Sequence, residues 1–464
     1  MHRAICYTKI MSIFKAYDIR GIYPSELNEE TAYNVGRAYA QLMREENPGT
    51  KILKIVLAHD MRLSADTLTK EALRGLIEGG VDVVFVGLAS TPTFYFAVAY
   101  YGYDGGFMVS ASHNPKEYNG FKLVRRRAAP MGGETGIKTI EEMIAKKGFD
   151  TPPRTGKMTR KANVLRDQVA HDLKFGNIRK IKPFKVVVDA ANAMGALYLD
   201  ALFKKLPCEL VKMNFDLDGS FPAHEADPLK EENMRDLEKR VAAEKADLGI
   251  ATDGDGDRIF FVDNEGKSIE QAIIRGILAK IFLHERPGAK IGYDIRPGKI
   301  TRDMIEQYGG TPIVTKVGHS LIKDQAIREG AYFAGESSGH FFLNMEHGCY
   351  EVPMIVTLKL MQEFSESGKT VAEYVRPLKK YFHSGEINSR VRDVAEVIEA
   401  TANRYQDGKL DRLDGISVEY HDFWFNVRGS NTEPVIRLNL EARTKELMHK
   451  KRDEVLALIR SFSK

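Results

Sequence analysis

The chain has 464 residues, of which 43% are hydrophobic and 28% charged, values that are ordinary for soluble globular proteins. Lys and Arg number 68 and Asp and Glu 64, a balance too even to indicate a nucleic-acid binder. No apolar run approaches the ~20 residues of a membrane span, and the first residues lack the apolar core of a signal peptide.

The length exceeds what one hydrophobic core can organise, so we expect roughly three or four domains. The cysteines are widely separated and lack CxxC spacing, which indicates neither a disulfide framework nor a zinc site and favours a reducing cytoplasm. A strand-like pattern, SIFKAYDIRG, begins just after Met11, which is an alternative to Met1 as the translation start.

Short strands rich in Val and Ile alternate with helical stretches, which is the pattern of βαβ units. Between Asn28 and Met43, apolar residues recur at helical spacing and predict a helix with one buried face: Ala32, Val35, Tyr39 and Leu42. The predicted strands are residues 52–60, 81–88 and 106–111 in a first unit, 184–189 and 247–251 in a second, and 290–294, 312–315 and 331–334 in a third.

Residues 148–161 lack apolar periodicity and contain two adjacent prolines, so they predict a domain boundary. Residues 416–442 alternate like an antiparallel hairpin, and Val455, Leu458, Ile459 and Phe462 predict a closing amphipathic helix. We therefore predict an α/β protein with three similar α/β domains that contain mixed sheets, followed by a C-terminal α+β domain with an antiparallel sheet. The predicted domains are residues 1–155, 156–264, 265–381 and 382–464.

The segment VSASHNPKEYNGFKL, residues 109–123, follows an apolar strand and is predicted to be a loop, because its proline and glycine forbid a continuing helix. Ser112 alone is typical of a turn or a helix cap. With Lys122 and a metal loop elsewhere it fits a phosphoserine, which needs charge neutralisation. A hydrolase pair of Ser112 and His113 is disfavoured, since adjacent residues on an extended loop diverge and no GxSxG elbow is present.

The segment TDGDGDR, residues 252–258, is the strongest metal signal. Its aspartates alternate with glycines, so a tight turn can point three carboxylates at one Mg²⁺: Asp253, Asp255 and Asp257. An EF-hand is excluded because Arg258 and Asn264 stand where that motif needs glycine and glutamate, and because the loop follows a strand. A turn that binds nothing is disfavoured, since three close carboxylates repel one another without a cation.

Two further polar loops are candidates for substrate binding. Considered alone, the sequence of each loop is also compatible with an ordinary polar turn. GESSGH, residues 335–340, offers Glu336 and Ser338 to sugar hydroxyls and His340 for phosphate binding or proton transfer. RGSNTEP, residues 428–434, has the composition of a phosphate cradle, with a guanidinium fork, two hydroxyls and an amide.

Together these four loops resemble those of the α-D-phosphohexomutase superfamily, specifically its phosphomannomutase/phosphoglucomutase group, from FKAYDIRG at Phe14 to the last helix. The resemblance implies four domains around a central cleft. It implies catalytic roles for Ser112, His113, Lys122, Arg20, Arg258 and His340. It implies Mg²⁺ ligation by Asp253, Asp255, Asp257 and phosphorylated Ser112. It implies substrate binding by Tyr17, His319, Glu336, Ser338, Arg428, Ser430, Asn431 and Thr432.

The implied reaction interconverts hexose 1-phosphate and hexose 6-phosphate through phospho-Ser112 and a hexose 1,6-bisphosphate, which is also the activator. The implied partner is therefore a small phosphosugar, and no nucleic acid or membrane is expected. GESSGH is closer to the GEMSGH form of the phosphomannomutase/phosphoglucomutase group than to the GEESGG or GEQSGH forms, which favours mannose or glucose on the strength of Ser337. Members often carry aspartates where this chain has CYEVPM, residues 349–354.

Three alternatives stay open: a phosphoglucosamine mutase, a Mg²⁺-dependent sugar-phosphate phosphatase, and a non-catalytic sugar-phosphate sensor. The loop at residues 428–434 argues against the phosphatase, because hydrolysis needs no second phosphate clamp. The presence of every expected catalytic residue type argues against the sensor.

Overall fold

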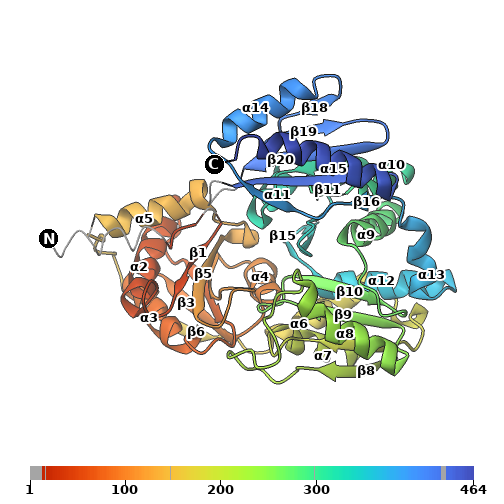
Figure 1. The fold of residues 1–464 in the computed structure, drawn as a ribbon. Helices are drawn as coiled ribbons and strands as arrows, with labels where there is room; N and C mark the ends of the chain where they lie inside the picture. Colours follow the sequence, from red (N-terminus) through yellow and green to blue (C-terminus); the bar gives the residue numbers. More distant parts are fainter. Residues whose placement is uncertain (1–12, 16, 147, 297, 430–434, 464) are drawn as a thin grey trace. The chain divides into compact units, whose positions relative to one another are not determined.

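The structure, a computed structural model, describes residues 13–463 except residues 16, 147, 297 and 430–434. It separates into two compact units (Figure 1). Unit 1 consists of Met1–Ile269 and Ser338–Ala372, and unit 2 of Glu270–Ser337 and Glu373–Lys464. Within the described part of the chain, no helix combines the length and the apolar character that crossing a membrane requires.

The first sheet of unit 1 contains β1 (Ile19–Ile22), β2 (Lys54–His59), β3 (Asp82–Leu88), β4 (Gly105–Val109), β5 (Tyr118–Arg125) and β6 (Met158–Arg160). Its strand order is β1-β5-β4-β2-β3-β6. β2 runs parallel to β3 and β4, whereas β5 is antiparallel to β4 and β1, so the sheet is mixed as predicted. The helices of this region are α2 (Glu29–Glu46), α3 (Ala65–Glu78), α4 (Thr91–Tyr100) and α5 (Lys138–Ala145).

The helix predicted between Asn28 and Met43 is α2, which lies beside α3 in Figure 1. It begins where the side chain of Asn28 accepts a hydrogen bond from the Thr31 backbone, a common N-cap. Its predicted apolar face is buried. Tyr39 on that face also donates its hydroxyl to the carbonyl of Val124 at 2.8 Å, which fixes the helix on β5.

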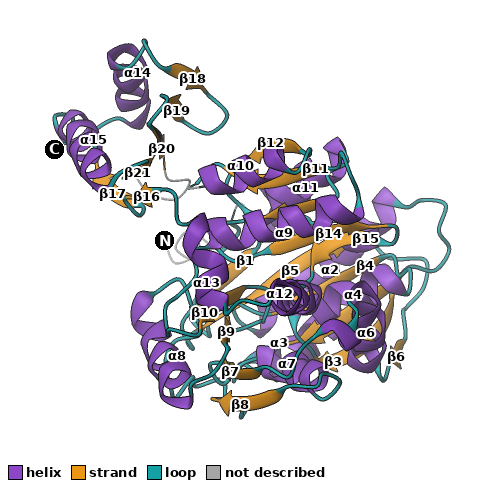
Figure 2. Ribbon diagram, turned by 90° about the vertical axis from the view of Figure 1, so that its right-hand side faces the viewer, coloured by secondary structure: helices purple, strands orange, loops and turns teal. Residues whose placement is uncertain are grey.

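The second sheet of unit 1 contains β7 (Lys185–Asp189), β8 (Glu209–Met213), β9 (Leu248–Thr252) and β10 (Ile259–Asp263), with α6 (Val164–Asp172), α7 (Gly195–Phe203) and α8 (Glu231–Glu244). The order is β10-β9-β7-β8, with β7 parallel to both neighbours and β10 antiparallel to β9. The antiparallel hairpin of β14 (Phe341–Met345) and β15 (Gly348–Glu351) also belongs to unit 1. It is followed by α12 (Pro353–Ser367), which packs on α6 and α7 (Figure 2).

Unit 2 begins with the parallel strands β11 (Lys290–Asp294), β12 (Thr311–Thr315) and β13 (Phe333–Gly335), of which β11 pairs with both others. The accompanying helices are α9 (Gln271–Glu285), α10 (Lys299–Gln307) and α11 (His319–Glu329). The short helix α13 (Val371–Val375) follows later in the chain.

The C-terminal part of unit 2 is an antiparallel sheet, as predicted. Its strands are β16 (Phe382–His383), β17 (Ile387–Arg390), β18 (Lys409–Asp411), β19 (Ile416–Glu419), β20 (Phe423–Gly429) and β21 (Val435–Ala442). β20 and β21 form the expected hairpin pair. Two helices complete this part, α14 (Val394–Arg404) and α15 (Lys445–Arg460), and α15 buries Val455 and Ile459 in the same core as the sheet.

The sequence predicts four domains, whereas the structure separates into two compact units. β6 pairs with β3 and so continues the first sheet to Arg160, past the predicted end at residue 155. Residues 338–372, which the predicted third domain includes, belong to unit 1. The predicted ends at residues 155, 264 and 381 stay predictions.

Candidate active site

The loop that carries Ser112 begins directly after β4 ends at Val109, at the carboxyl edge of the first sheet. Ser112 has a left-handed backbone, with φ of 51°, which is uncommon outside glycine and asparagine. Its hydroxyl donates to Asp253 Oδ2 at 2.9 Å and lies 3.2 Å from Nδ1 of His113. Its amide donates to the hydroxyl of Ser110 at 3.0 Å. The hydroxyl is thus aimed at the acidic loop although the two are far apart in sequence.

Arg62 fixes the conformation of this loop through hydrogen bonds to its backbone, and the sequence analysis did not predict this role. The buried guanidinium donates to the carbonyls of Ser112 and Asn114 at 2.8 and 2.6 Å and to those of Pro115 and Tyr118 at 2.8 and 2.9 Å. A strained backbone persists only where its surroundings over-determine it. These bonds supply that constraint at the serine.

The acidic loop follows β9, as expected, and packs directly on the serine loop. A β-carbon at Gly254 would lie 2.3 Å from the Ser112 carbonyl oxygen, so only glycine permits this approach. Asp253, Asp255 and Asp257 are at most 1% exposed, and Oδ1 of Asp255 is buried without a hydrogen-bond donor. Burial and the other two carboxylates hold the pKa of Asp253 well above its usual range. This crowding of oxygen ligands fits a hard divalent cation.

Lys122, on β5, extends into the same cluster. Its ammonium donates to Asp257 Oδ2 at 2.6 Å and also bonds to Asp255 Oδ2. Burial opposes this charge, but the two carboxylates prevail and hold the pKa of Lys122 well above its usual value, so the side chain is a fixed cation. Thr91, at the start of α4, donates its hydroxyl to Asp255 Oδ2 at 2.6 Å and was also missed from sequence.

Arg20 bonds to the serine loop, and His113 is part of that loop. Arg20 donates to Asp18 at 2.7 Å and to the Ala111 carbonyl at 3.2 Å, and it bonds to the side chain of Asn114. Burial, assisted by the nearby cations Arg258 and Arg20, lowers the pKa of His113 well below its usual value. This imidazole is therefore neutral at physiological pH.

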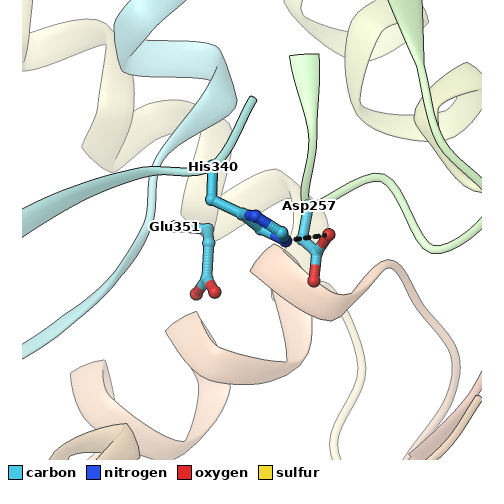
Figure 3. A group of neighbouring side chains, drawn as sticks. All are labelled: Asp257, His340 and Glu351. Atoms are coloured by element: carbon cyan, nitrogen blue, oxygen red, sulfur yellow. Dashed lines mark ion pairs between the residues drawn. The ribbon is translucent and has the colours of Figure 1, made fainter. Parts of the chain in front are cut away.

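Arg258 and His340 are joined by an isolated antiparallel bridge, so the end of the acidic loop is tied to the start of β14. His340 Nε2 lies 3.1 Å from Asp257 Oδ1, and its Nδ1 lies 2.9 Å from the Ser338 hydroxyl (Figure 3). Arg258 donates its backbone amide to Asp253 at 3.1 Å. Unit 1 thus brings together every predicted catalytic residue and Ser338.

Among the described residues, unit 2 holds three of the predicted substrate-binding residues, His319, Glu336 and Arg428. Glu336 accepts hydrogen bonds from Arg296 at 3.0 Å and from the Gly318 amide at 3.2 Å, and His319 begins α11 beside that glycine. Arg428 is buried and donates to Glu386 at 2.5 Å. Ser430, Asn431 and Thr432 lie outside the described residues. Tyr17, half-buried, precedes β1 in unit 1.

Ser337, on which the expected sugar preference rests, has its hydroxyl in a buried polar cluster. The hydroxyl donates to Asp294 Oδ1 at 2.8 Å and accepts from Arg275 at 2.9 Å, and its amide also donates to Asp294 at 3.1 Å. Arg275 and Asp294 are almost fully buried. The hydroxyl therefore anchors the loop and is already engaged, which weakens its use as a direct reader of sugar stereochemistry.

Family models named phosphoglucomutase/phosphomannomutase match the chain in four consecutive segments. The α/β/α domains I, II and III match residues 11–151, 166–266 and 272–381, and the C-terminal domain matches residues 386–458.

Similar proteins match over the full length. Phosphomannomutase from Escherichia coli is 38% identical over 462 residues, which cover 97% of this chain and 99% of that protein. Phosphomannomutase from Methanocaldococcus jannaschii is 38% identical over 459 residues, which cover 97% and 98%. The crystal structure of a phosphoglucomutase/phosphomannomutase family protein from Burkholderia thailandensis superimposes with a TM-score of 0.87, 32% identity and 97% coverage of both chains.

Proposed function

The chain belongs to the phosphoglucomutase/phosphomannomutase family, and from this premise we propose that it interconverts hexose 1-phosphate and hexose 6-phosphate through a phosphorylated Ser112. The observation that carries the proposal is the direct contact of the Ser112 hydroxyl with Asp253, in a cluster that also contains the Lys122 ammonium. A serine that carries a phosphoryl group needs this combination of a cation and a metal-ligating loop.

In the proposed reaction, the phosphorus–Oγ bond of phospho-Ser112 breaks as a bond forms between phosphorus and a sugar hydroxyl oxygen. The hydroxyl proton passes to His340, the candidate base, because Lys122 is already a cation and cannot accept a proton. The hexose 1,6-bisphosphate then turns over, and its other phosphoryl group returns to Oγ. Arg20 and Arg258 lie at this centre and would balance the charge of the phosphoryl oxygens.

The proposed cofactor is Mg²⁺, held by Asp253, Asp255, Asp257 and an oxygen of the phosphoserine. Bound there, Mg²⁺ would withdraw negative charge from the phosphoryl group. The buried Oδ1 of Asp255, which has no hydrogen-bond donor, supports a cation at this position. The bisphosphate serves as both intermediate and activator.

The phosphate that is not reacting needs a separate binding site. We assign this role to Arg428 with Ser430, Asn431 and Thr432. A guanidinium holds phosphate by paired, charge-assisted hydrogen bonds. Arg428 already bonds to Glu386. Burial alone would raise the pKa of Glu386, but the nearby Arg428 lowers it. This carboxylate therefore stays ionised and orients the guanidinium. Glu336, Ser338, His319 and Tyr17 are proposed to contact the sugar.

The proposed substrates are mannose and glucose phosphates in the cytoplasm. The relatives named phosphomannomutase support mannose, and relatives from Xanthomonas campestris are named more broadly as phosphohexose mutases. Because Ser337 bonds to Asp294, this preference depends on the relatives more than on that side chain.

Ser112→Ala tests the proposal. Turnover of mannose 1-phosphate and glucose 1-phosphate, each supplied with its bisphosphate, should fall at least about a thousandfold, because the phosphoryl carrier is removed. Intact mass should show one phosphate on the parent and none on the variant, with unchanged thermal unfolding. Ser461→Ala, at the exposed end of α15, serves as the matched control.

Equal turnover in Ser112→Ala and the parent would refute the phosphoserine mechanism. Release of inorganic phosphate without isomerisation would favour the phosphatase. A parallel assay with glucosamine and N-acetylglucosamine 1-phosphates tests the phosphoglucosamine alternative.

A further inference from the structure

A second group of potential metal ligands adjoins the acidic loop. It consists of Asp257, His340 and Glu351, each of which offers one ligand atom, and these three atoms lie within 4.8 Å of one another. Figure 3 shows the three side chains. The three residues are 1%, 3% and 0% exposed. Glu351 was not a candidate from sequence, where its surroundings, CYEVPM, only marked a departure from the family pattern.

The backbone brings together Glu351 on β15, His340 just before β14, and Asp257 in the loop between β9 and β10. Glu351 is the last residue of β15 and lies opposite Phe342 in the hairpin, just after His340. The amide of Val352 donates to the carbonyl of Phe341 at 2.9 Å, and the His340–Arg258 bridge then ties the hairpin to the residue after Asp257.

The two oxygens of Asp257 face different partners. Oδ2 accepts from the Lys122 ammonium at 2.6 Å, within the acidic loop cluster. Oδ1 is buried and is paired with His340 Nε2 at 3.1 Å. One carboxylate can therefore serve the Mg²⁺ loop with one oxygen and the second group with the other, as bridging carboxylates do in two-metal sites.

We propose that Asp257, His340 and Glu351 form a second cation site, selective for a divalent transition metal such as Zn²⁺ or Co²⁺. An imidazole nitrogen with two carboxylates is a typical ligand set for these ions, whereas Mg²⁺ takes oxygen ligands almost exclusively. The Ser338 hydroxyl at His340 Nδ1 fixes the ring and directs Nε2 into the group, which is the usual arrangement around a metal-bound histidine. Small side-chain movements would bring the ligand atoms to coordination distances.

The site has a functional consequence that rests on the function proposed above. A cation bound here occupies Nε2 of His340, a candidate for proton transfer. Zn²⁺ should therefore inhibit the mutase while Mg²⁺ remains at its own loop. Excess Mg²⁺ should not relieve the inhibition, because Mg²⁺ competes poorly for an imidazole nitrogen.

The test is a Co²⁺ titration of the chelator-treated full-length protein in excess Mg²⁺, followed by visible absorption. The parent should develop a saturable band with one equivalent of Co²⁺. Glu351→Gln, which keeps the shape of the side chain, should weaken this binding at least about tenfold, since even outer-shell partners contribute that much to metal affinity. Asp253→Asn, which alters the Mg²⁺ loop alone, is the matched control and should bind Co²⁺ within about threefold of the parent.

Several outcomes would overturn the site. These are the absence of a saturable Co²⁺ band, an unchanged affinity in Glu351→Gln, or loss of the band in Asp253→Asn, which would put Co²⁺ in the Mg²⁺ loop. If Glu351→Gln fails to fold by circular dichroism, His340→Gln must lose the band instead. The Co²⁺ absorption band can be measured without enzymatic turnover. An active mutase that shows no band would therefore refute only this cation site. An inactive protein that binds Co²⁺ would refute only the proposed function.

Discussion

Arg62 illustrates how one residue can control a reactive group that it does not touch. Its guanidinium reaches only backbone carbonyls of the serine loop, among them that of Ser112 itself. Asp60 lies 3.4 Å from its Nε and keeps the buried charge compensated. The arrangement needs a planar fork with several donors, which lysine lacks.

We therefore predict that Arg62→Lys lowers kcat by about 10- to 100-fold and leaves KM within about threefold. The reason is that misplacing a reacting group by about 1 Å can cost two orders of magnitude in rate, while the substrate contacts remain. Steady-state kinetics on the proposed substrate pair measure both constants. Arg74→Lys, on the exposed face of α3, is the matched control. A variant with parental kcat would show that the loop holds its shape without this fork.

At the scale of elements, the β14–β15 hairpin carries a histidine in its turn that packs among aromatic rings. His347 lies 5.1 Å from His171 and 5.7 Å from Tyr100, measured between ring centroids, and its Nε2 is 2.8 Å from the Tyr350 hydroxyl. Burial, with the proximity of His171 and Arg127, lowers the pKa of His347 to about 4. The packing of this hairpin therefore favours the neutral form of the His347 imidazole.

This pKa predicts a pH dependence of stability. Because the folded-state pKa lies below the unfolded value of about 6.5, acidification protonates the unfolded chain first. The stabilisation is present above about pH 6.5 and is lost as the pH falls toward 4, by on the order of 1 kcal/mol for a half-buried ring. Unfolding midpoints at pH 7.5 and 5.0 should therefore differ less in His347→Gln than in the parent. His421→Gln, at an exposed position, is the control, and equal pH shifts in the parent and His347→Gln would contradict the assignment.

The elements that sequence predicted well are those whose signal is local. The helical face of Ala32, Val35, Tyr39 and Leu42 repeats along one segment, so α2 could be predicted without knowing its partner. β6 has no apolar pattern, and its strand character comes only from pairing with β3, so it was missed. Strand identity at a sheet edge is decided by the neighbour.

The residues of the candidate active site also differ in whether local sequence was enough to predict them. The acidic loop and Ser112 were predicted because their residue types and spacing carry the chemistry themselves. Glu351 joins His340 only through the register of a hairpin, which composition does not disclose. The direction of the Ser337 hydroxyl, toward Asp294, likewise depends on a strand more than forty positions away in the chain, so the sequence did not disclose that this serine anchors its loop.

At the scale of the whole molecule, the proposed Mg²⁺ loop lies in unit 1, whereas Trp424, the single tryptophan of the chain, lies in unit 2. Its indole donates to Glu441 at 2.6 Å, and the same carboxylate accepts the amides of Gly298 and Lys299 at 3.1 Å. Tryptophan fluorescence therefore reports on unit 2 specifically.

We predict that Mg²⁺ stabilises unit 1 more than unit 2. A ligand at one hundred times its Kd stabilises the unit that binds it by about 2.7 kcal/mol. Hydrogen exchange of β9 in urea should then shift its midpoint upward with Mg²⁺, while the Trp424 fluorescence midpoint moves less. Asp255→Asn should remove the shift in β9. Coincident midpoints with and without Mg²⁺ would mean that the two units unfold as one cooperative body.

The interleaving of the two units also sets an order of events on the ribosome. Unit 1 is interrupted after Ile269 and resumes only at Ser338, so the first portion of unit 2 leaves the exit tunnel before unit 1 is complete. A nascent chain can form the sheet that carries Ser112 early, because domains tend to fold as they emerge. His340 and Glu351 arrive only with the later segment. The nascent protein therefore has its acidic loop in place before the histidine that faces it has been synthesised.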